Sequence, residues 1–163
     1  MLLVFPALMA YAAFSDLFTM TISNWISVLL VIAFVGAALL VGMPAAQIGL
    51  HLACGLAVLA LTFALFCFGW IGGGDAKLAA TTAVWMGFEH LAEYGLGAAL
   101  IGGALTLAIL QFRRWPLPGW ARARDWTMRL HDKDNGVPYG MALAAAGLAL
   151  YPETGLFLRA LAA

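Results

Sequence analysis

Long apolar runs, separated by short polar stretches, make up almost the whole chain. A segment that crosses a bilayer needs about 20 mainly apolar residues, and a helix satisfies its own backbone hydrogen bonds in lipid. The pattern therefore predicts an all-α integral membrane protein, a six-transmembrane-helix bundle that forms one domain over residues 1–163. The predicted spans cover approximately residues 2–17, 25–43, 48–71, 78–88, 95–112 and 137–158.

The fourth of these runs is too short to cross on its own. Residues 78–88 give about 16 Å of helix, against an apolar bilayer core of about 30 Å. We therefore expect a spanning helix here to begin near Asp75 and to continue past Glu89 towards Tyr94. In the last run, Pro152 predicts a break, because proline removes a backbone donor and clashes with the preceding helical turn.

Composition indicates the same class of protein. Hydrophobic residues make up 64% of the chain and charged residues 10%, and the mean hydropathy is +0.97. A soluble domain carries about 25% charged residues. The formal net charge of zero argues against nucleic-acid binding, which relies on a surplus of lysine and arginine.

The stretch between the fifth and sixth predicted helices holds most of the basic residues. These are Arg113, Arg114, Arg122, Arg124, Arg129 and Lys133. The positive-inside rule makes this stretch cytoplasmic, and alternating crossings then put the turns after the first and third helices on the same side. Residues 120–130 predict one short interfacial helix on the headgroups. Its apolar face would carry Trp120, Ala123, Trp126 and Leu130.

Two aspartates stand at the edges of apolar runs on this predicted cytoplasmic side. Asp16 closes the first run, and Asp75 follows three glycines in the Gly-Gly-Gly-Asp-Ala-Lys sequence of residues 72–77. A carboxylate at the edge of lipid is costly and marks a functional site by default. Two carboxylates that share one proton can hydrolyse an amide, because the ionised one takes a proton from water while the protonated one polarises the carbonyl. The glycines would accept unusual dihedral angles and allow a substrate to approach closely.

The aspartates also have other interpretations. Asp75 could be the N-cap of the fourth helix, and Asp16 a helix end at the interface. Nucleotide binding is disfavoured, because a P-loop has lysine after its last glycine, where this chain has Asp75. A small proton- or cation-coupled transporter that uses both acids is the alternative function. A non-catalytic assembly subunit would leave them without a role.

Three motifs, in order along most of the chain, carry a family resemblance. Residues 72–77 resemble the Gly-x-Gly-Asp signature of the type IV prepilin peptidases. Asp16, followed by Ile-Ser-Asn at residues 22–24, resembles their first aspartate box, in which Ile-Pro-Asn follows the aspartate. Val-Pro-Tyr-Gly at residues 137–140 resembles the motif that opens their last helix. The chain departs from the family at Ser23, where proline is usual, and at Phe18 and Met20, where many members carry basic residues.

The resemblance implies an aspartic-type endopeptidase of the bacterial inner membrane that removes the positively charged leader from prepilins at the cytoplasmic face. Carried over by position, Asp16 and Asp75 would be the catalytic pair. The short chain resembles the compact members that serve tight-adherence (Flp) pili, and nothing matches the cysteine-containing segment of larger members with N-methyltransferase activity. The implied partners are a prepilin or pseudopilin and the lipid bilayer, and no cofactor is implied.

Several residues near the pair are candidates to bind substrate or to support the carboxylates. They are Gly72, Gly73, Gly74, Lys77, Asn24 and Tyr139. Lys77 stands two residues past Asp75, so on a helix it points about 200° away from it and would meet headgroups or an acidic substrate residue. Asn24 and Tyr139 could orient the pair by hydrogen bonding.

No metal site is expected. Glu89, His90 and Glu93 lack a second histidine at helical spacing and would face away from the aspartates, so a solvated turn is the better interpretation. Cys54 and Cys67 are separated by about 20 Å of helical rise, so they cannot pair with each other and are expected to pack as small apolar residues.

Overall fold

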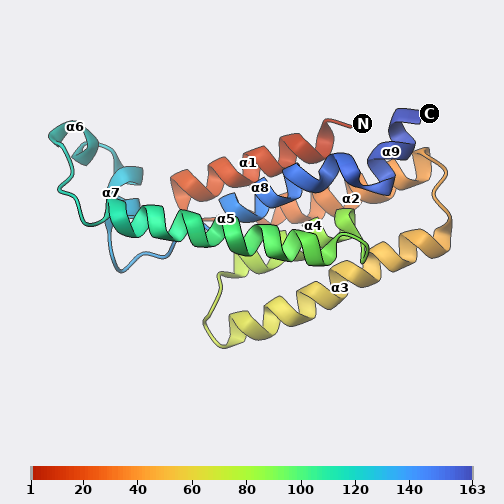
Figure 1. The fold of residues 1–163 in the computed structure, drawn as a ribbon, viewed down its shortest axis with the longest axis horizontal. Helices are drawn as coiled ribbons and strands as arrows, with labels where there is room; N and C mark the ends of the chain where they lie inside the picture. Colours follow the sequence, from red (N-terminus) through yellow and green to blue (C-terminus); the bar gives the residue numbers. More distant parts are fainter. Residues whose placement is uncertain (1, 163) are drawn as a thin grey trace.

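The computed structural model describes residues 2–162, which form helices and connecting turns without a strand. The longer helices lie together in a bundle, and an arm with two short helices extends beyond one end (Figure 1). The expected all-α class is confirmed. The elements are α1 Val4–Thr19, α2 Asn24–Leu40, α3 Ala45–Cys67, α4 Gly73–Met86, α5 Leu91–Phe112, α6 Gly119–Arg122, α7 Asp125–His131, α8 Gly140–Leu150, η1 Tyr151–Glu153 and α9 Gly155–Ala162.

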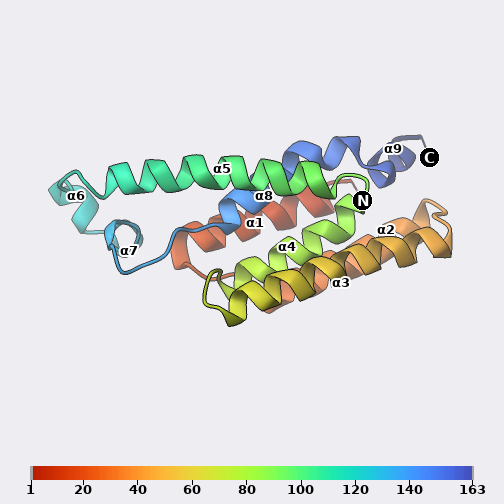
Figure 2. The same cartoon turned by 60° about the horizontal axis from the view of Figure 1, so that its bottom comes forward.

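Helix α4 runs through the centre of the bundle (Figure 2). It packs against α3, α2 and α8, and ten of its 14 residues are buried. Trp85 is its largest buried side chain: the ring lies on Phe5 with centroids 4.8 Å apart, and the indole N–H donates to the Leu30 carbonyl oxygen at 3.0 Å. Because a buried N–H needs a partner, this bond holds α4 against α2 in one position.

The fourth predicted span is shorter than expected. α4 begins at Gly73, close to Asp75 as predicted, but it ends at Met86, so the continuation past Glu89 that a full crossing would require is not found. Gly87 takes a φ of 67°, a left-handed conformation that glycine adopts without steric cost, and the chain turns into α5 at Leu91. The helix therefore rises only about 21 Å.

Two helices, α3 and α5, are long and apolar enough to cross a membrane. The pair formed by α8–η1 and α9 adds a third span if it is counted as one, and its bend of 47° next to η1 confirms the predicted break at Pro152. Helices α1 and α2 are apolar but shorter. Two to three spans are thus supported by length and composition, and the full set of six stays a prediction.

The predicted interfacial helix is two helices instead of one. α6 and α7 are separated at Ala123 and Arg124, where Arg124 has extended dihedral angles of −117° and 120°. The hydroxyl of Thr127 donates to the carbonyl oxygens of Ala121 and Arg124, which stabilises this break. The apolar face expected for residues 120–130 is therefore divided. Trp120 is exposed, whereas Trp126 of α7 packs against α1.

Candidate active site

Asp16 lies in the last turn of α1, and its carboxylate is buried against the start of α8. The backbone N–H of Gly140 donates to Asp16 Oδ2 at 2.8 Å, and the aspartate is only 5% exposed. A Cβ atom at position 140 would lie 2.8 Å from that same oxygen and 2.6 Å from Ile22 Cδ1. Glycine is thus required here because the helix N-terminus approaches the carboxylate so closely.

Asp75 lies in the first turn of α4, and its side chain turns back towards Gly72. The N-cap residue Gly72 has ordinary extended dihedral angles of −72° and 145°, and Gly73 and Gly74 are helical. The expectation that these glycines adopt unusual dihedral angles is therefore wrong. Their small size matters instead, because a Cβ would lie 3.0 Å from Asp75 Oδ2 at position 72 and 3.1 Å from Ile22 Cβ at position 74.

The two aspartates face one cavity of about 320 Å³. Its walls come from the end of α1, the turn before α2 and the start of α4. They are formed by Asp16, Met20, Thr21, Ile22, Asn24, Gly72, Gly73, Gly74, Asp75 and Lys77. The carboxylates of Asp16 and Asp75 are close enough to interact electrostatically. Two acids about 60 positions apart in the sequence thus share one site, whereas the predicted topology put them only on the same side of the membrane.

Lys77 and Asn24 form a polar pair at the edge of this cavity. The Lys77 ammonium group donates to Asn24 Oδ1 at 2.8 Å. Although Lys77 stands about 200° around α4 from Asp75, its long side chain lines the same cavity. Within residues 2–162, Asn24 makes its side-chain hydrogen bond to Lys77, and its predicted hydrogen bond to an aspartate is not found.

Tyr139 lies next to Asp75 on a second cavity of about 620 Å³. Gly72 and Trp70 also contribute to the walls of this cavity, so Asp75 stands between two openings. The Tyr139 hydroxyl donates to the Ala98 carbonyl oxygen at 3.1 Å, which joins α8 to α5. Its expected hydrogen bond to the pair is not found in the described part of the chain.

Arg113 holds the segment that leads into α8. Its Nε donates to the Leu130 carbonyl oxygen at 2.8 Å, and its Nη2 donates to the carbonyl oxygens of Asn135 and Gly136, both at 2.9 Å. These bonds fix the chain a few residues before Gly140, whose N–H reaches Asp16. From the sequence, Arg113 was expected only as one of the basic residues that mark the cytoplasmic side, and Gly140 had no predicted role. The Val-Pro-Tyr-Gly motif was the signal that could have identified Gly140.

A second arginine fastens the arm to the end of α1. Arg129 Nη2 donates to the Phe18 carbonyl oxygen at 2.6 Å, and the Phe18 and Trp126 rings meet edge to face with centroids 5.5 Å apart. Positive charge is favourable at the C-terminus of a helix. The basic arm therefore lies at the same end of the molecule as Asp16.

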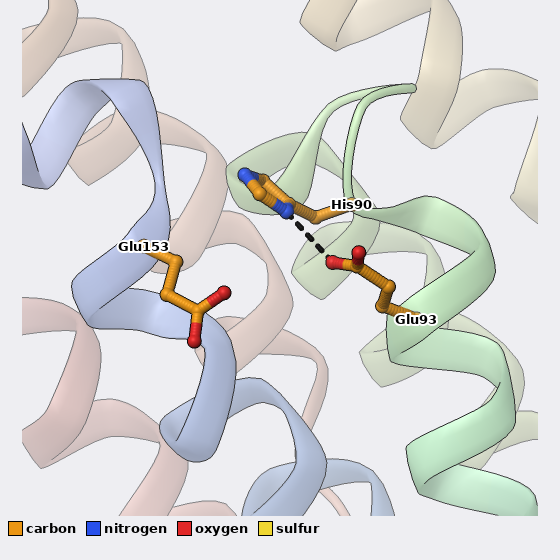
Figure 3. A group of neighbouring side chains, drawn as sticks. All are labelled: His90, Glu93 and Glu153. Carbon is orange, nitrogen blue, oxygen red and sulfur yellow. Dashed lines mark hydrogen bonds and ion pairs between the residues drawn. The ribbon is translucent and has the colours of Figure 1, made fainter.

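His90, Glu93 and Glu153 form a cluster of neighbouring side chains (Figure 3). His90 Nδ1 lies 2.9 Å from Glu93 Oε2, and one potential ligand atom from each of the three side chains falls within 4.8 Å of the others. Next to Glu153, the Tyr151 hydroxyl donates to the Leu2 carbonyl oxygen before α1, whereas Asp16 lies about 20 Å further along that helix. The cluster could hold a cation, but it is not part of the candidate active site.

The fold and the cavity shared by Asp16 and Asp75 define an apolar, all-α protein with one buried and one half-buried acid at one end of a helical bundle. A model of the type IV leader peptidase family matches residues 3–107, a stretch that contains both aspartates and the three glycines. The chain belongs to this family, and the protein is a leader peptidase of the prepilin type. No curated protein and no solved structure matches the chain.

Proposed function

We propose that the protein is an aspartic-type endopeptidase that removes the leader peptide of type IV prepilins of the tight-adherence (Flp) class at the cytoplasmic face of the bacterial inner membrane. The observation that carries this proposal is the cavity shared by Asp16 and Asp75. Membership of a peptidase family does not favour the transporter alternative, which relied on the same two acids.

In the proposed mechanism, the two carboxylates share one proton. The ionised carboxylate takes a proton from a water molecule, and the water oxygen attacks the scissile carbonyl carbon. The protonated carboxylate donates to the carbonyl oxygen as negative charge develops there. The C–N bond then breaks, and a proton passes to the leaving amine. The pair titrates as a unit, so each role belongs to the pair and not to one aspartate.

The neighbouring groups would set the geometry of this reaction. The Gly140 N–H holds one oxygen of Asp16 and leaves the other oxygen to act on water or substrate. Lys77 adds a fixed positive charge at the edge of the cavity, where it would attract a carbonyl or carboxylate oxygen of the prepilin. Asn24 would orient Lys77, and Tyr139 would hold α8 in place.

The cytoplasmic orientation is supported by the position of the basic residues. Arg129 contacts the end of α1 near Asp16, and Arg113 fixes the segment that precedes Gly140. The basic arm and the aspartates therefore share one end of the bundle, and the positive-inside rule favours a cytoplasmic position for that end. We further propose that cleavage is not followed by N-methylation, because the chain has no segment that resembles the methyltransferase part of larger members.

Co-expression with a Flp-type prepilin, in a host without another prepilin peptidase, tests the proposal. The wild-type chain should shorten the prepilin, and mass spectrometry should locate one cut. Asp75→Asn should leave the prepilin at full length. Asp125→Asn, which changes an exposed acid in the arm, should still allow the prepilin to be shortened. An uncut prepilin in the presence of well-expressed wild-type protein would contradict the proposal.

A further inference from the structure

A hollow of about 290 Å³ lies where α5 meets the basic arm. Its walls are formed by Leu110, Arg113, Arg114 and Lys133. Three of these four residues are cations, and no acidic residue within residues 2–162 lines the hollow. α5 runs directly into the arm (Figure 2), and hydrogen bonds from Arg113 hold the stretch that returns from α7 against the end of α5. Two separate segments thus bring positive charge to one place.

The protein does not neutralise this charge within the described chain. None of the three cations forms an ion pair with a carboxylate of residues 2–162. Asp132 and Asp134 flank Lys133 in the sequence, but neither lines the hollow. The Asp132 carboxylate accepts instead from the Asp134 N–H and from the side-chain amide of Asn135, both at 3.1 Å, so it is held within its own turn. Three like charges around one hollow repel one another and attract an anion.

Arg113 gives the hollow a cation in a fixed position. Its guanidinium donates through Nε and Nη2 to three backbone carbonyl oxygens, and these bonds do not use Nη1. Arg113 and Arg114 follow the C-terminus of α5, where positive charge is favourable without any ligand. That explanation does not extend to Lys133, which follows α7. The fold therefore gathers more positive charge here than the end of α5 accounts for.

The hollow also lies at the end of an apolar helix. α5 is one of the two helices that are long and apolar enough to cross a membrane. Leu110, in the wall of the hollow, is 47% exposed, and Trp115, just past the helix, is 68% exposed. Exposed tryptophan next to a spanning helix is typical of the membrane–water interface. The cations therefore stand at the level of the lipid headgroups, with an apolar side chain on the side of the acyl chains.

We propose that this hollow binds the phosphate group of an anionic phospholipid. Arg113, Arg114 and Lys133 would donate charge-assisted hydrogen bonds to the phosphate oxygens, and Leu110 would contact the start of an acyl chain. A zwitterionic headgroup is disfavoured, because it would bring its own ammonium group against three cations. A free phosphate ion would use the cations but not the apolar wall. The inference goes beyond the proposed function and does not depend on it, since no residue of the aspartate cavity takes part.

Native mass spectrometry of the purified full-length chain in detergent tests the inference, with phosphatidylglycerol, phosphatidylcholine or inorganic phosphate added separately. The wild-type chain should bind its first phosphatidylglycerol about 10-fold or more tightly than phosphatidylcholine. The double variant Arg114→Gln/Lys133→Gln should lose this preference, because it removes two of the three cations and keeps the hydrogen bonds of Arg113. Arg122→Gln/Arg124→Gln is the matched control: it removes two exposed arginines of the arm that do not line the hollow, and it should keep the preference.

A further variant separates loss of charge from loss of fold. Arg114→Lys/Lys133→Arg keeps both charges and should keep the preference for phosphatidylglycerol. If the two glutamine double variants lose the preference alike, the overall charge of the arm attracts the lipid and the inference is wrong. It is also wrong if the wild-type chain binds phosphatidylcholine as tightly as phosphatidylglycerol. Inorganic phosphate that binds the wild-type chain as tightly as the anionic lipid, and that the Arg114→Gln/Lys133→Gln variant does not bind, would identify a free anion as the ligand and overturn the assignment to lipid.

Discussion

Replacement of Gly140 by alanine is the sharpest perturbation of the candidate site that leaves both aspartates in place. An added Cβ would lie 2.8 Å from Asp16 Oδ2 and 3.1 Å from Asp16 Cγ, closer than unbonded atoms pack. The carboxylate must therefore move, and the 2.8 Å hydrogen bond from the Gly140 N–H must lengthen or break. Hydrogen bonds to charged groups contribute about 1.5–3 kcal/mol. If the whole of this contribution supports the transition state, the cleavage rate falls by about 10- to 150-fold.

The assay is the rate of prepilin cleavage by purified protein in lipid vesicles, with the amount of folded protein measured in parallel. Gly136→Ala is the matched control, because it lies in the same segment and a Cβ there would meet nothing within 4 Å in the described structure. We expect Gly136→Ala to cleave at the wild-type rate. A Gly140→Ala variant that cleaves within about twofold of wild type would refute the view that the α8 N-terminus positions Asp16.

Three further predictions concern the arm, the topology and the product. Arg113→Ala should slow cleavage by about 10-fold, because three carbonyl oxygens before α8 lose their donor. Arg114→Ala removes a neighbouring charge but none of those hydrogen bonds, so it should have little effect on the cleavage rate. If both variants slowed cleavage equally, a positioning role for Arg113 would be contradicted. In a background without native cysteines, Leu17→Cys and Asp125→Cys should be protected from an impermeant periplasmic thiol reagent, whereas Leu91→Cys should react; the reverse pattern would place the site outside. Mass spectrometry of mature pilin made by this chain alone should show a free amine, and a methylated N-terminus would disprove the activity that we propose.

The sequence predicted the features that depend on long apolar runs and on charges at their ends. Asp16 closes one apolar run and Asp75 follows another, and the structure places both in one cavity. The count of crossings that put them on one side of the membrane stays a prediction. The break at Pro152 was predictable for a different reason, because proline excludes a regular helix regardless of its neighbours.

Features that depend on a single contact were not predictable. α4 ends early because Gly87 takes a left-handed conformation, and glycine alone does not reveal which conformation it adopts. The arm breaks at Arg124 through hydrogen bonds of the Thr127 hydroxyl, although neither residue is a strong helix breaker. The hydrogen bond from Gly140 to Asp16 could not be predicted from the sequence. Its donor is a backbone N–H, which every residue except proline carries, so the residue type gives no signal.

The most direct test of the central claim compares Asp16→Asn, Asp75→Asn and the double variant in one kinetic assay of prepilin cleavage. Two carboxylates that act as one unit should each be indispensable, so each single variant should lose at least about 10³-fold in rate, and the double variant should be no slower than either single one. Protein amount and membrane insertion should match wild type in all three. A single asparagine variant that cleaves at near the wild-type rate would contradict the shared-proton mechanism.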